Sequence, residues 1–582
     1  MTCLRNLLIT TQRNLPKDSI LHKIWGEYLP PSIRSRVWRY LAAPGTGAPE
    51  YLQALDRIGH ELDNYIISVQ PEKSIRVLYG PSFSIHSPSF IHDRILSYAL
   101  RLRGAEIIPI YCDAIQSVEC NVYGGMWGGG TKFKRNCENC VDQSQKLWRP
   151  NPGPASKLSQ YLKRSEIKTI AMKVVHLSAD SWIDYVEDGL PFGRWAKDIL
   201  VNNYVVGDYH LVPDYHALGL AHLKNLLLLR VAYQRIIDNV EPDCVISNDS
   251  YYGMWAILEN LCKRKEIPFY SHWSGTRRSA WCYAYNDAAM NLDFSQPWQG
   301  FSQIPMNERQ KDKVQTWLKG RTQGEEMIFD TASLATHLTD ESKLTSIDLI
   351  KPTALLAANV IWDLSALNKQ IVFADMIDWI AQTIEWFTVH PEFQLIIKPH
   401  PAELNPSIPQ TEERIEVGLL NRKVDLPSNV ILLSPRAELK VYDLFPLIKV
   451  GLVYTTTTGL EMAGIGLPVI TSAKAPYRGF GFTLDPVSKD DYFNILYRSL
   501  SGEKILDLET QRDLSWKFIL FNFFHYYSKI DILDFKFGEI PRLKIKSLVD
   551  LLPGSNKHLD YILDSIIDGQ PILSETCWPP ES

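Results

Sequence analysis

The chain has 582 residues, of which 45% are hydrophobic and 22% are charged, a composition typical of a globular protein with two or three domains and not of a disordered one. Its 61 Lys and Arg residues against 66 Asp and Glu residues leave a net charge of −5, which excludes the basic surface that non-specific nucleic-acid binding requires. Because no apolar stretch is long enough to span a membrane and no signal-peptide pattern occurs, we expect a soluble cytoplasmic protein.

The first 70 residues are expected to form a helical extension that packs outside the first sheet. Apolar side chains recur there at helical spacing, for example at Leu52, Leu55, Ile58 and Leu62. A first Rossmann-like domain is expected over residues 71–310.

This domain opens with a strand–helix–strand pattern. Apolar runs predict strands at 74–79 and 106–111, with a helix over 91–102 between them. Such a unit has parallel strands, so polar residues after the first strand lie at the carboxyl edge of the sheet, where ligands bind. His86, His92 and Asp93 are candidates there, although each histidine alone is more typical of a surface or capping position.

Four of the nine cysteines cluster in an insert over residues 112–140, around a glycine-rich loop; they are Cys112, Cys120, Cys137 and Cys140. Cys137-x-x-Cys140 resembles a zinc knuckle, and two earlier thiols would complete a tetrahedral site for a structural zinc ion. The spacing from Cys112 to Cys120 is looser than in zinc ribbons, so the alternative is a set of reduced cytosolic thiols. Disulfides are not expected in a cytosolic chain.

Later in the first domain, two predicted strands at 244–250 and 267–272 carry Asp249 and His272 to one sheet edge. A carboxylate there could activate an acceptor or act as a covalent nucleophile, with His272 beside it. The alternative for Asp249 is a helix N-cap. Trp273, Trp281 and Tyr283 would either stack on a sugar ring or cover the sheet.

Residues 295–325 are polar and resemble a hinge, and a second Rossmann-like domain is expected over 325–490. Its predicted strands lie near 353–360, 393–398, 429–433, 450–454 and 468–471, alternating with helices, as in a doubly wound sheet. Residues 491–524 are predicted to form helices, because their apolar side chains recur at helical spacing. The tail from residue 550 to residue 582 is expected to be peripheral.

Two stretches of the second domain predict a phosphate site. Lys398-Pro-His400 directly follows a buried strand, so an ammonium and an imidazole point off its carboxyl end. A second strand leads into a turn made of Thr455, Thr456, Thr457, Thr458 and Gly459, which offers hydroxyls and backbone N–H groups at a helix start. The alternative for the threonines is a helix cap.

Residues 350–530 resemble the capsule-polysaccharide glycosyltransferases of GT-B architecture, relatives of the bacterial Kdo transferases. The matching residues are Asn359-Val-Ile-Trp-Asp363, Met376-x-x-Trp379, Lys398-Pro-His-Pro-Ala-Glu403, Thr458-Gly-Leu-Glu461, Gly466-x-Pro-Val-Ile470 and Tyr477-Arg-Gly-x-Gly-Phe-Thr483. The resemblance implies two doubly wound domains that face each other across a crevice, with the helices of 491–524 crossing back onto the first domain. It also implies a CMP-, UDP- or GDP-sugar donor, a glycan or glycolipid acceptor, and work beside a membrane-bound polysaccharide assembly at the inner face of the plasma membrane.

No Asp-x-Asp pair occurs in the chain, so we expect transfer without a metal or other cofactor. Lys398, His400, the threonine turn and Arg478 would stabilise the leaving phosphate, with Glu403 in the same motif. Glu461 would reach the ribose hydroxyls; the alternative is a carboxylate that merely stabilises a helix start. Two other functions stay open: a nucleotide-sugar 2-epimerase of the same fold, and a non-catalytic assembly or export partner.

Overall fold

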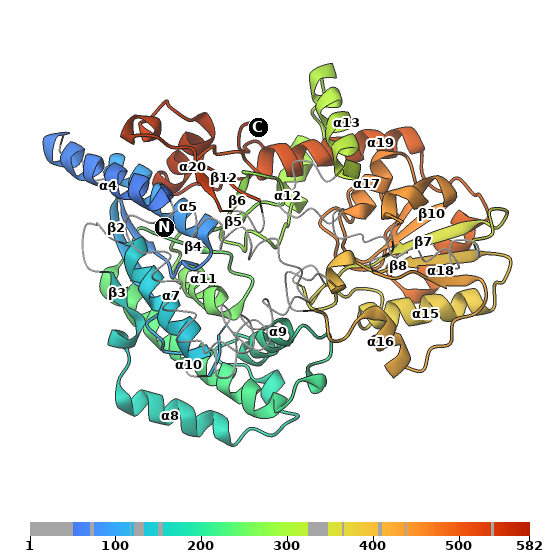
Figure 1. The fold of residues 1–582 in the computed structure, drawn as a ribbon, viewed down its shortest axis with the longest axis horizontal. Helices are drawn as coiled ribbons and strands as arrows, with labels where there is room; N and C mark the ends of the chain where they lie inside the picture. The colour runs from blue at the N-terminus through green and yellow to red at the C-terminus, as the bar shows by residue number, and fades with distance from the viewer. Residues whose placement is uncertain are drawn as a thin grey trace, which may run out of the picture.

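The computed structural model describes residues 50–69, 71, 75–116, 118–120, 133–148, 155–323, 347–363, 366–404, 410–435, 437, 439–536 and 540–582. The helices expected before residue 50 lie outside this part of the chain. Two α/β domains lie beside each other, each built on its own mainly parallel sheet (Figure 1). This is the GT-B-like architecture that the sequence predicted.

The first sheet has six strands in the order β3-β2-β1-β4-β5-β6, and only the β5–β6 pair is antiparallel. The strands are β1 (Arg76–Tyr79), β2 (Glu106–Tyr111), β3 (Ser156–Lys157), β4 (Cys244–Asn248), β5 (Phe269–Ser274) and β6 (Trp281–Tyr285). The predicted strands are confirmed, whereas β3 and β6 were not predicted. Sequence periodicity identifies neither, because β3 has two residues and β6 carries aromatic side chains on both faces.

Helices cover both faces of this sheet. One face packs against α4 (Glu50–Val69), α5 (Ser87–Leu102) and a helix from the end of the chain. The other face packs against α8 (Arg164–Val175), α9 (Phe192–Tyr204), α10 (Tyr215–Val240) and α11 (Gly253–Arg264). The other helices of this domain are α7 (Phe133–Leu147) and the short η3 (Leu158–Tyr161), η4 (Trp182–Asp184) and η5 (Tyr209–Leu211). Leu55, Ile58 and Leu62 are fully buried, as their spacing predicted.

The second sheet has five parallel strands in the order β11-β10-β7-β8-β9. The strands are β7 (Thr353–Ala357), β8 (Gln394–Lys398), β9 (Val430–Leu432), β10 (Val450–Val453) and β11 (Val469–Thr471), all of them predicted. Their residues are almost all buried, because helices cover both faces of a parallel sheet.

One face of the second sheet packs against α15 (Met376–Thr388), α16 (Ile415–Asn421) and α18 (Lys489–Leu500). The other face packs against α12 (Ser295–Phe301), α13 (Glu308–Gln323), α17 (Thr458–Gly464) and α19 (Leu508–Leu520). The remaining turns are η7 (Pro401–Leu404) and η8 (Val441–Leu447). Val314 and Trp317 of the predicted hinge are buried in this core, so α13 is a fixed part of the second domain.

The end of the chain returns to the first domain. Helix α19 continues into the π-helix η9 (Phe521–Tyr526), after which Ser528 pairs with Trp281 of β6. A two-stranded sheet of β12 (Leu533–Asp534) and β13 (Arg542–Leu543) follows, then η10 (Leu548–Leu551) and α20 (Lys557–Ile567).

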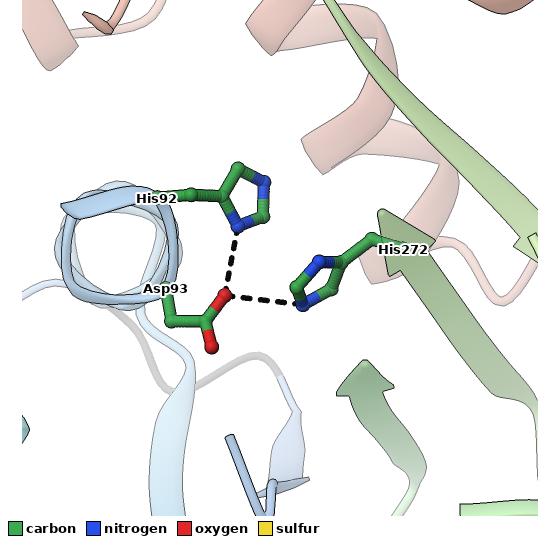
Figure 2. Close-up of side chains that lie close together, drawn as sticks. All are labelled: His92, Asp93 and His272. Carbon is green, nitrogen blue, oxygen red and sulfur yellow. Dashed lines mark hydrogen bonds and ion pairs between the residues drawn. The ribbon is translucent and has the colours of Figure 1, made fainter. Parts of the chain in front are cut away.

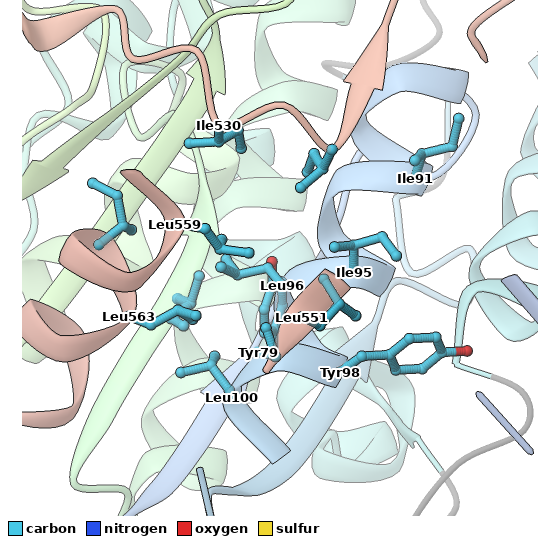
Figure 3. Close-up of a cluster of buried hydrophobic side chains, with 14 of the residues drawn as sticks. Tyr79, Ile91, Ile95, Leu96, Tyr98, Leu100, Ile530, Leu551, Leu559 and Leu563 are labelled. Carbon is cyan, nitrogen blue, oxygen red and sulfur yellow. The ribbon is translucent and has the colours of Figure 1, made fainter. Parts of the chain in front are cut away.

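The expectation of a peripheral tail is wrong. Leu551, Leu559 and Leu563 are buried in the same core as Tyr79 and the apolar face of α5 (Figure 3). A helix with such a strongly apolar face stabilises the fold by burying it, and here it is buried against the same sheet face as α4 and α5. Among the described helices, none combines the length and apolar character needed to cross a bilayer.

The loops that follow β4 and β7 connect the two domains. The hydroxyl of Tyr251 donates to the carbonyl of Leu367 at 2.6 Å, and the amide of Asn368 donates to Asp198 of α9 at 2.8 Å. A second contact lies after α9, where Glu413 accepts hydrogen bonds from the backbone of Gly207 and Asp208, both at 2.8 Å. The carboxyl edges of the two sheets are therefore next to each other.

Candidate functional site

Three neighbouring strands of the second sheet, β10, β7 and β8, deliver polar residues to one carboxyl edge. Asn359 follows β7, Lys398 ends β8 and Thr455 follows β10. The side-chain carbonyl of Asn359 accepts the backbone N–H of Thr455 at 3.2 Å, which joins the β7 and β10 ends. The structure thus brings the two predicted phosphate-binding stretches to the same sheet edge, at the ends of β8 and β10 with β7 between them.

Lys398 supplies a cation at this edge. Its side chain is 4% exposed, and its ammonium donates to the carbonyls of Ser434 at 3.1 Å and Pro435 at 3.4 Å. Burial lowers its pKa to about 8. No carboxylate within the described ranges pairs with it, so its charge is satisfied only by dipoles and can still bind an anion.

His400 is a neutral hydrogen-bond donor in this structure. Its Nδ1 accepts the backbone N–H of Ala402 at 3.1 Å, so the proton is on Nε2. Burial lowers its pKa to about 4, and the positive charges of Lys398 and Arg321 add to the effect. The expected charge-assisted contact is therefore corrected: His400 would meet a phosphate as a neutral imidazole.

Arg321 of α13 is a residue of this edge that the sequence did not indicate. Its Nε lies 2.7 Å from Oε1 of Glu461 in α17, with side chains 13% and 2% exposed. The charge of Glu461 is thus neutralised by a buried ion pair, and its contact with ribose stays a prediction. Arg321 lies in the last turn of a helix that was predicted to be part of a hinge. A basic residue at that helix end is the signal that could have identified it.

The threonine turn is held mostly by its own groups. The backbone N–H of Thr458 donates to the hydroxyl of Thr456 at 3.3 Å, and the hydroxyl of Tyr477 donates to the carbonyl of Thr456 at 2.6 Å. Thr457 is exposed and Thr455 is buried. A Cβ on Gly459 would lie 2.3 Å from the Tyr477 hydroxyl, so glycine is required there for close packing.

Two predicted donor ligands have structural partners instead. Arg478 donates to the carbonyl and hydroxyl of Thr471 at 2.8 and 2.7 Å and to the carbonyl of Pro486, so its guanidinium braces the loop after β11. Glu403 is fully buried, accepts the backbone N–H of Ile415 at 3.1 Å and has its pKa raised to about 8 by burial. Glu403 is thus corrected to a structural residue, because its side chain is not accessible, whereas contact of the half-buried Arg478 with a phosphate stays a prediction.

On the first domain, Asp249 lies just beyond β4 and is 4% exposed. Its Oδ1 accepts the backbone N–H of Met290 at 3.0 Å. Burial is the main cause that raises its pKa to about 7, and nearby Glu259 and Asp287 contribute to the same rise. It is not a helix cap, because α11 begins at Gly253 and Tyr252 takes the capping position. A carboxyl that titrates near neutral pH suits general acid–base chemistry.

Lys369 of the second domain was not predicted as a site residue, but its positive charge acts on Asp249 and lowers the pKa of that carboxyl. Its ammonium lies 5.3 Å from the ring centre of Tyr251 and 3.5 Å from the side-chain oxygen of Asn291. Burial and Lys474 lower its pKa to about 8, while Asp249 and its neighbours partly oppose this shift. Residues of both domains therefore surround the one carboxylate placed for chemistry.

The prediction that His272 lies beside Asp249 is wrong. His272 is fully buried on the other side of the first sheet, where its Nε2 lies 3.1 Å from Asp93. His92 lies 2.8 Å from the same carboxylate oxygen through its Nδ1 (Figure 2). Adjacent strand positions point to opposite faces, so two residues at one edge need not meet.

The resulting His92–Asp93–His272 group is a structural network and does not fit a metal. The indole N–H of Trp281 donates to Nδ1 of His272 at 3.1 Å, so the ring proton of His272 must be on Nε2, facing Asp93. If Nε2 bound a metal, the ring proton would have to be on Nδ1. There it would face the N–H of Trp281, which is also a donor. Burial lowers the pKa of His92 to about 3, so it too is neutral.

The three aromatic residues that were predicted to stack on a sugar or cover the sheet lie in two different environments. Trp281 and Tyr283 are buried, and Tyr283 lies with its hydroxyl 2.6 Å from Nε2 of His92, so they cover the sheet and cannot stack on a sugar. Trp273 is half-buried and stacks on Phe83 and His86 with ring centres 5.9 and 6.2 Å apart.

The comparisons with known proteins bear on the fold alone. No protein-family model matches the chain, and no curated protein matches its sequence. Among solved structures, it is similar to KpsC of Thermosulfurimonas dismutans, a β-Kdo 2,4-transferase, at 13% identity over 56% of this chain and 87% of that chain, with a TM-score of 0.32. It is also similar to UDP-GlcNAc 2-epimerase from Neisseria meningitidis bound to UDP-GlcNAc, at 12% identity over 77% and 98% of the chains, with a TM-score of 0.22.

Such low identities and TM-scores carry no argument about activity. The GT-B-like fold class rests on the chain's own two sheets and the contact between their carboxyl edges. The activity must be argued from the side chains placed there.

Proposed function

We propose that the protein is a metal-independent glycosyltransferase that uses a nucleotide-sugar donor. The observation that carries this proposal is that a cation of the second domain and a carboxyl group of the first lie at sheet edges that are next to each other. The second domain presents Lys398, which no carboxylate of the described residues pairs with, and the first presents Asp249 with a pKa near 7. A cation for a leaving phosphate and a base for an acceptor are the two functions that sugar transfer needs.

In the proposed reaction, the donor phosphates bind to Lys398, to Nε2–H of His400 and to the exposed Thr457 of the threonine turn. Asp249 removes the proton from an acceptor hydroxyl, whose oxygen attacks the anomeric carbon. The bond from that carbon to the phosphate oxygen breaks, and the nucleotide leaves with its negative charge stabilised by Lys398. No metal is needed in this scheme, because fixed donors take its place.

Access to Asp249 requires movement. Because its side chain is 4% exposed, an acceptor must displace the loop that carries Lys369. That movement breaks the bonds from Tyr251 to Leu367 and from Asn368 to Asp198, both of which join the domains. Exclusion of water after reclosure would favour transfer over hydrolysis of the donor.

The test is incubation of the full chain with CMP-, UDP- and GDP-sugars in EDTA, each with and without a set of glycan and glycolipid acceptors. The proposal expects free nucleotide from one donor only when an acceptor is present, and less release by Asp249→Asn. Nucleotide release that occurs only with an added divalent metal would contradict the proposed chemistry. So would a rate of nucleotide release in Asp249→Asn equal to that of the wild type.

A nucleotide-sugar 2-epimerase is the second candidate, because it shares the fold and needs the same phosphate site. NMR of the same reactions distinguishes the two, since an epimerase converts the donor sugar at C2 without any acceptor. A protein that binds no nucleotide sugar at all would be a non-catalytic assembly or export partner. Capsular or surface polysaccharide is the acceptor class we propose for a transferase.

A further inference from the structure

The four clustered cysteines, which come from three segments, line one cavity of about 30 Å³; we call it the cysteine cavity. Its lining is Cys112, Cys120, Cys137 and Cys140 together with Pro81, Ser82, Gln116, Val141, Ser144 and Met254. Cys112 follows β2, whereas Cys137 and Cys140 lie on α7. The predicted tight knuckle is therefore corrected to a helix, on which residues three apart share one face.

Hydrogen-bonding groups lie beside two of the cysteines. The backbone N–H groups of Ala114 and Ile115 and the side chain of Gln116 donate to Cys112. The hydroxyls of Ser84 and Ser144 lie 2.6 Å apart, and that of Ser84 lies 3.5 Å from the carbonyl oxygen of Cys140. Donors of this kind stabilise thiolates and are the usual outer shell of a metal site.

The third segment is fixed by buried polar contacts. The side chain of Asn203 donates to the carbonyl of Cys120 at 3.3 Å, and that of Asn225 donates to the carbonyl of Glu119 at 3.1 Å. His222 lies 2.7 Å from the Glu119 carboxylate, and both are buried. Helices α9 and α10 thus hold Cys120 against the cavity.

We propose that the four cysteines of the cysteine cavity bind one structural zinc ion. Four thiolates are a set that zinc accepts in tetrahedral geometry, and the cavity has room for one ion but not for an iron–sulfur cluster. The ion would tie the end of β2, α7 and the segment at Cys120 to the end of β1. Since none of these residues takes part in the proposed transfer, the two proposals fail independently.

The ion would also have to draw the sulfurs together. Among the described residues, only His92, Asp93 and His272 bring three ligand atoms within 4.8 Å of one another. Zinc–sulfur bonds of about 2.3 Å would replace the cavity.

The test is elemental analysis of the full chain purified without chelators, followed by removal of the metal and titration with Co²⁺. We expect about one zinc per chain, a lower Tm after chelation, and the visible absorption of tetrahedral cobalt thiolate on titration. Cys137→Ser should abolish the metal content. Cys262→Ser is the matched control, because Cys262 is fully buried in α11 away from the cavity and its loss should leave the zinc unchanged.

Several results would overturn the proposal. They are wild-type protein that carries no zinc and gives no cobalt spectrum, iron with labile sulfide in place of zinc, and full zinc content in Cys137→Ser. If Cys137→Ser does not fold, the cobalt titration of the wild-type chain decides alone.

Discussion

Arg321 and Glu461 form an ion pair of 2.7 Å that joins α13 to α17 at the carboxyl edge of the second sheet. Both side chains are largely buried, so removal of one leaves the other charge without compensation. The pair therefore links α13, a helix of the second domain, to the proposed donor site.

Arg321→Gln should lower the free energy of unfolding by about 3–5 kcal/mol, because it leaves the buried carboxylate of Glu461 unpaired. The double variant with Glu461→Gln should recover most of this loss, since no charge is then buried. Urea unfolding measures both. Arg309→Gln, an exposed position on the same helix, is the control, and equal stability of the two single variants would contradict the ion pair's role.

Lys398→Ala should weaken binding of the donor nucleotide about 10- to 150-fold, the equivalent of about 1.5–3 kcal/mol for one charge-assisted contact. Isothermal titration with the nucleotide identified in the donor panel measures this. Lys351→Ala is the matched control, because Lys351 also donates to a carbonyl, that of Pro391 at 2.8 Å, but precedes β7 at the opposite edge of the sheet. A similar loss of nucleotide affinity in both variants would mean that the net charge of the protein, and not a contact with Lys398, determines binding.

Asp249→Asn should reduce kcat/KM about 10²- to 10⁴-fold, because the amide cannot accept the acceptor's proton. In the wild type, kcat/KM should rise with pH through about 7, where the carboxyl ionises. Asp293→Asn, a nearby carboxylate that lies 3.9 Å from Lys474, should keep the wild-type profile. If Asp249→Asn kept the wild-type dependence of kcat/KM on pH, Asp249 would not be the base, and another residue would have to be.

The same carboxyl predicts a pH effect on stability. Its pKa is raised on folding, so between about pH 4 and 7 the unfolded chain loses this proton first. Stability from this group is therefore greatest at low pH and decreases as pH rises to about 7. Asp249→Asn should remove that decrease, which urea unfolding at pH 5 and pH 8 would detect.

The sequence predicted much of the fold but less of the site. The strand over 106–111 was found at its observed bounds, and Lys398 was placed at a strand end, because both follow from local periodicity. Arg478 could not be assigned, since its partners are carbonyls of Thr471 and Pro486 that local pattern does not reveal. His272 was misplaced because the face that a strand residue takes depends on the register of its neighbours.

Leu563→Ala should cost about 2–5 kcal/mol of unfolding free energy, because the side chain is fully buried in the core shared with Tyr79. Val549→Ala is the control in the same tail, as Val549 is exposed. A negligible loss in Leu563→Ala would mean that the tail is peripheral after all.

The most direct measurement of the central claim is a structure of the protein with the nucleotide identified in the donor panel. The proposal predicts a phosphate oxygen within about 3 Å of the Lys398 ammonium, beside the Thr455–Thr458 turn and on the side that faces Asp249. A nucleotide bound on the first sheet, or on the second sheet away from the carboxyl ends of β8 and β10, would contradict it.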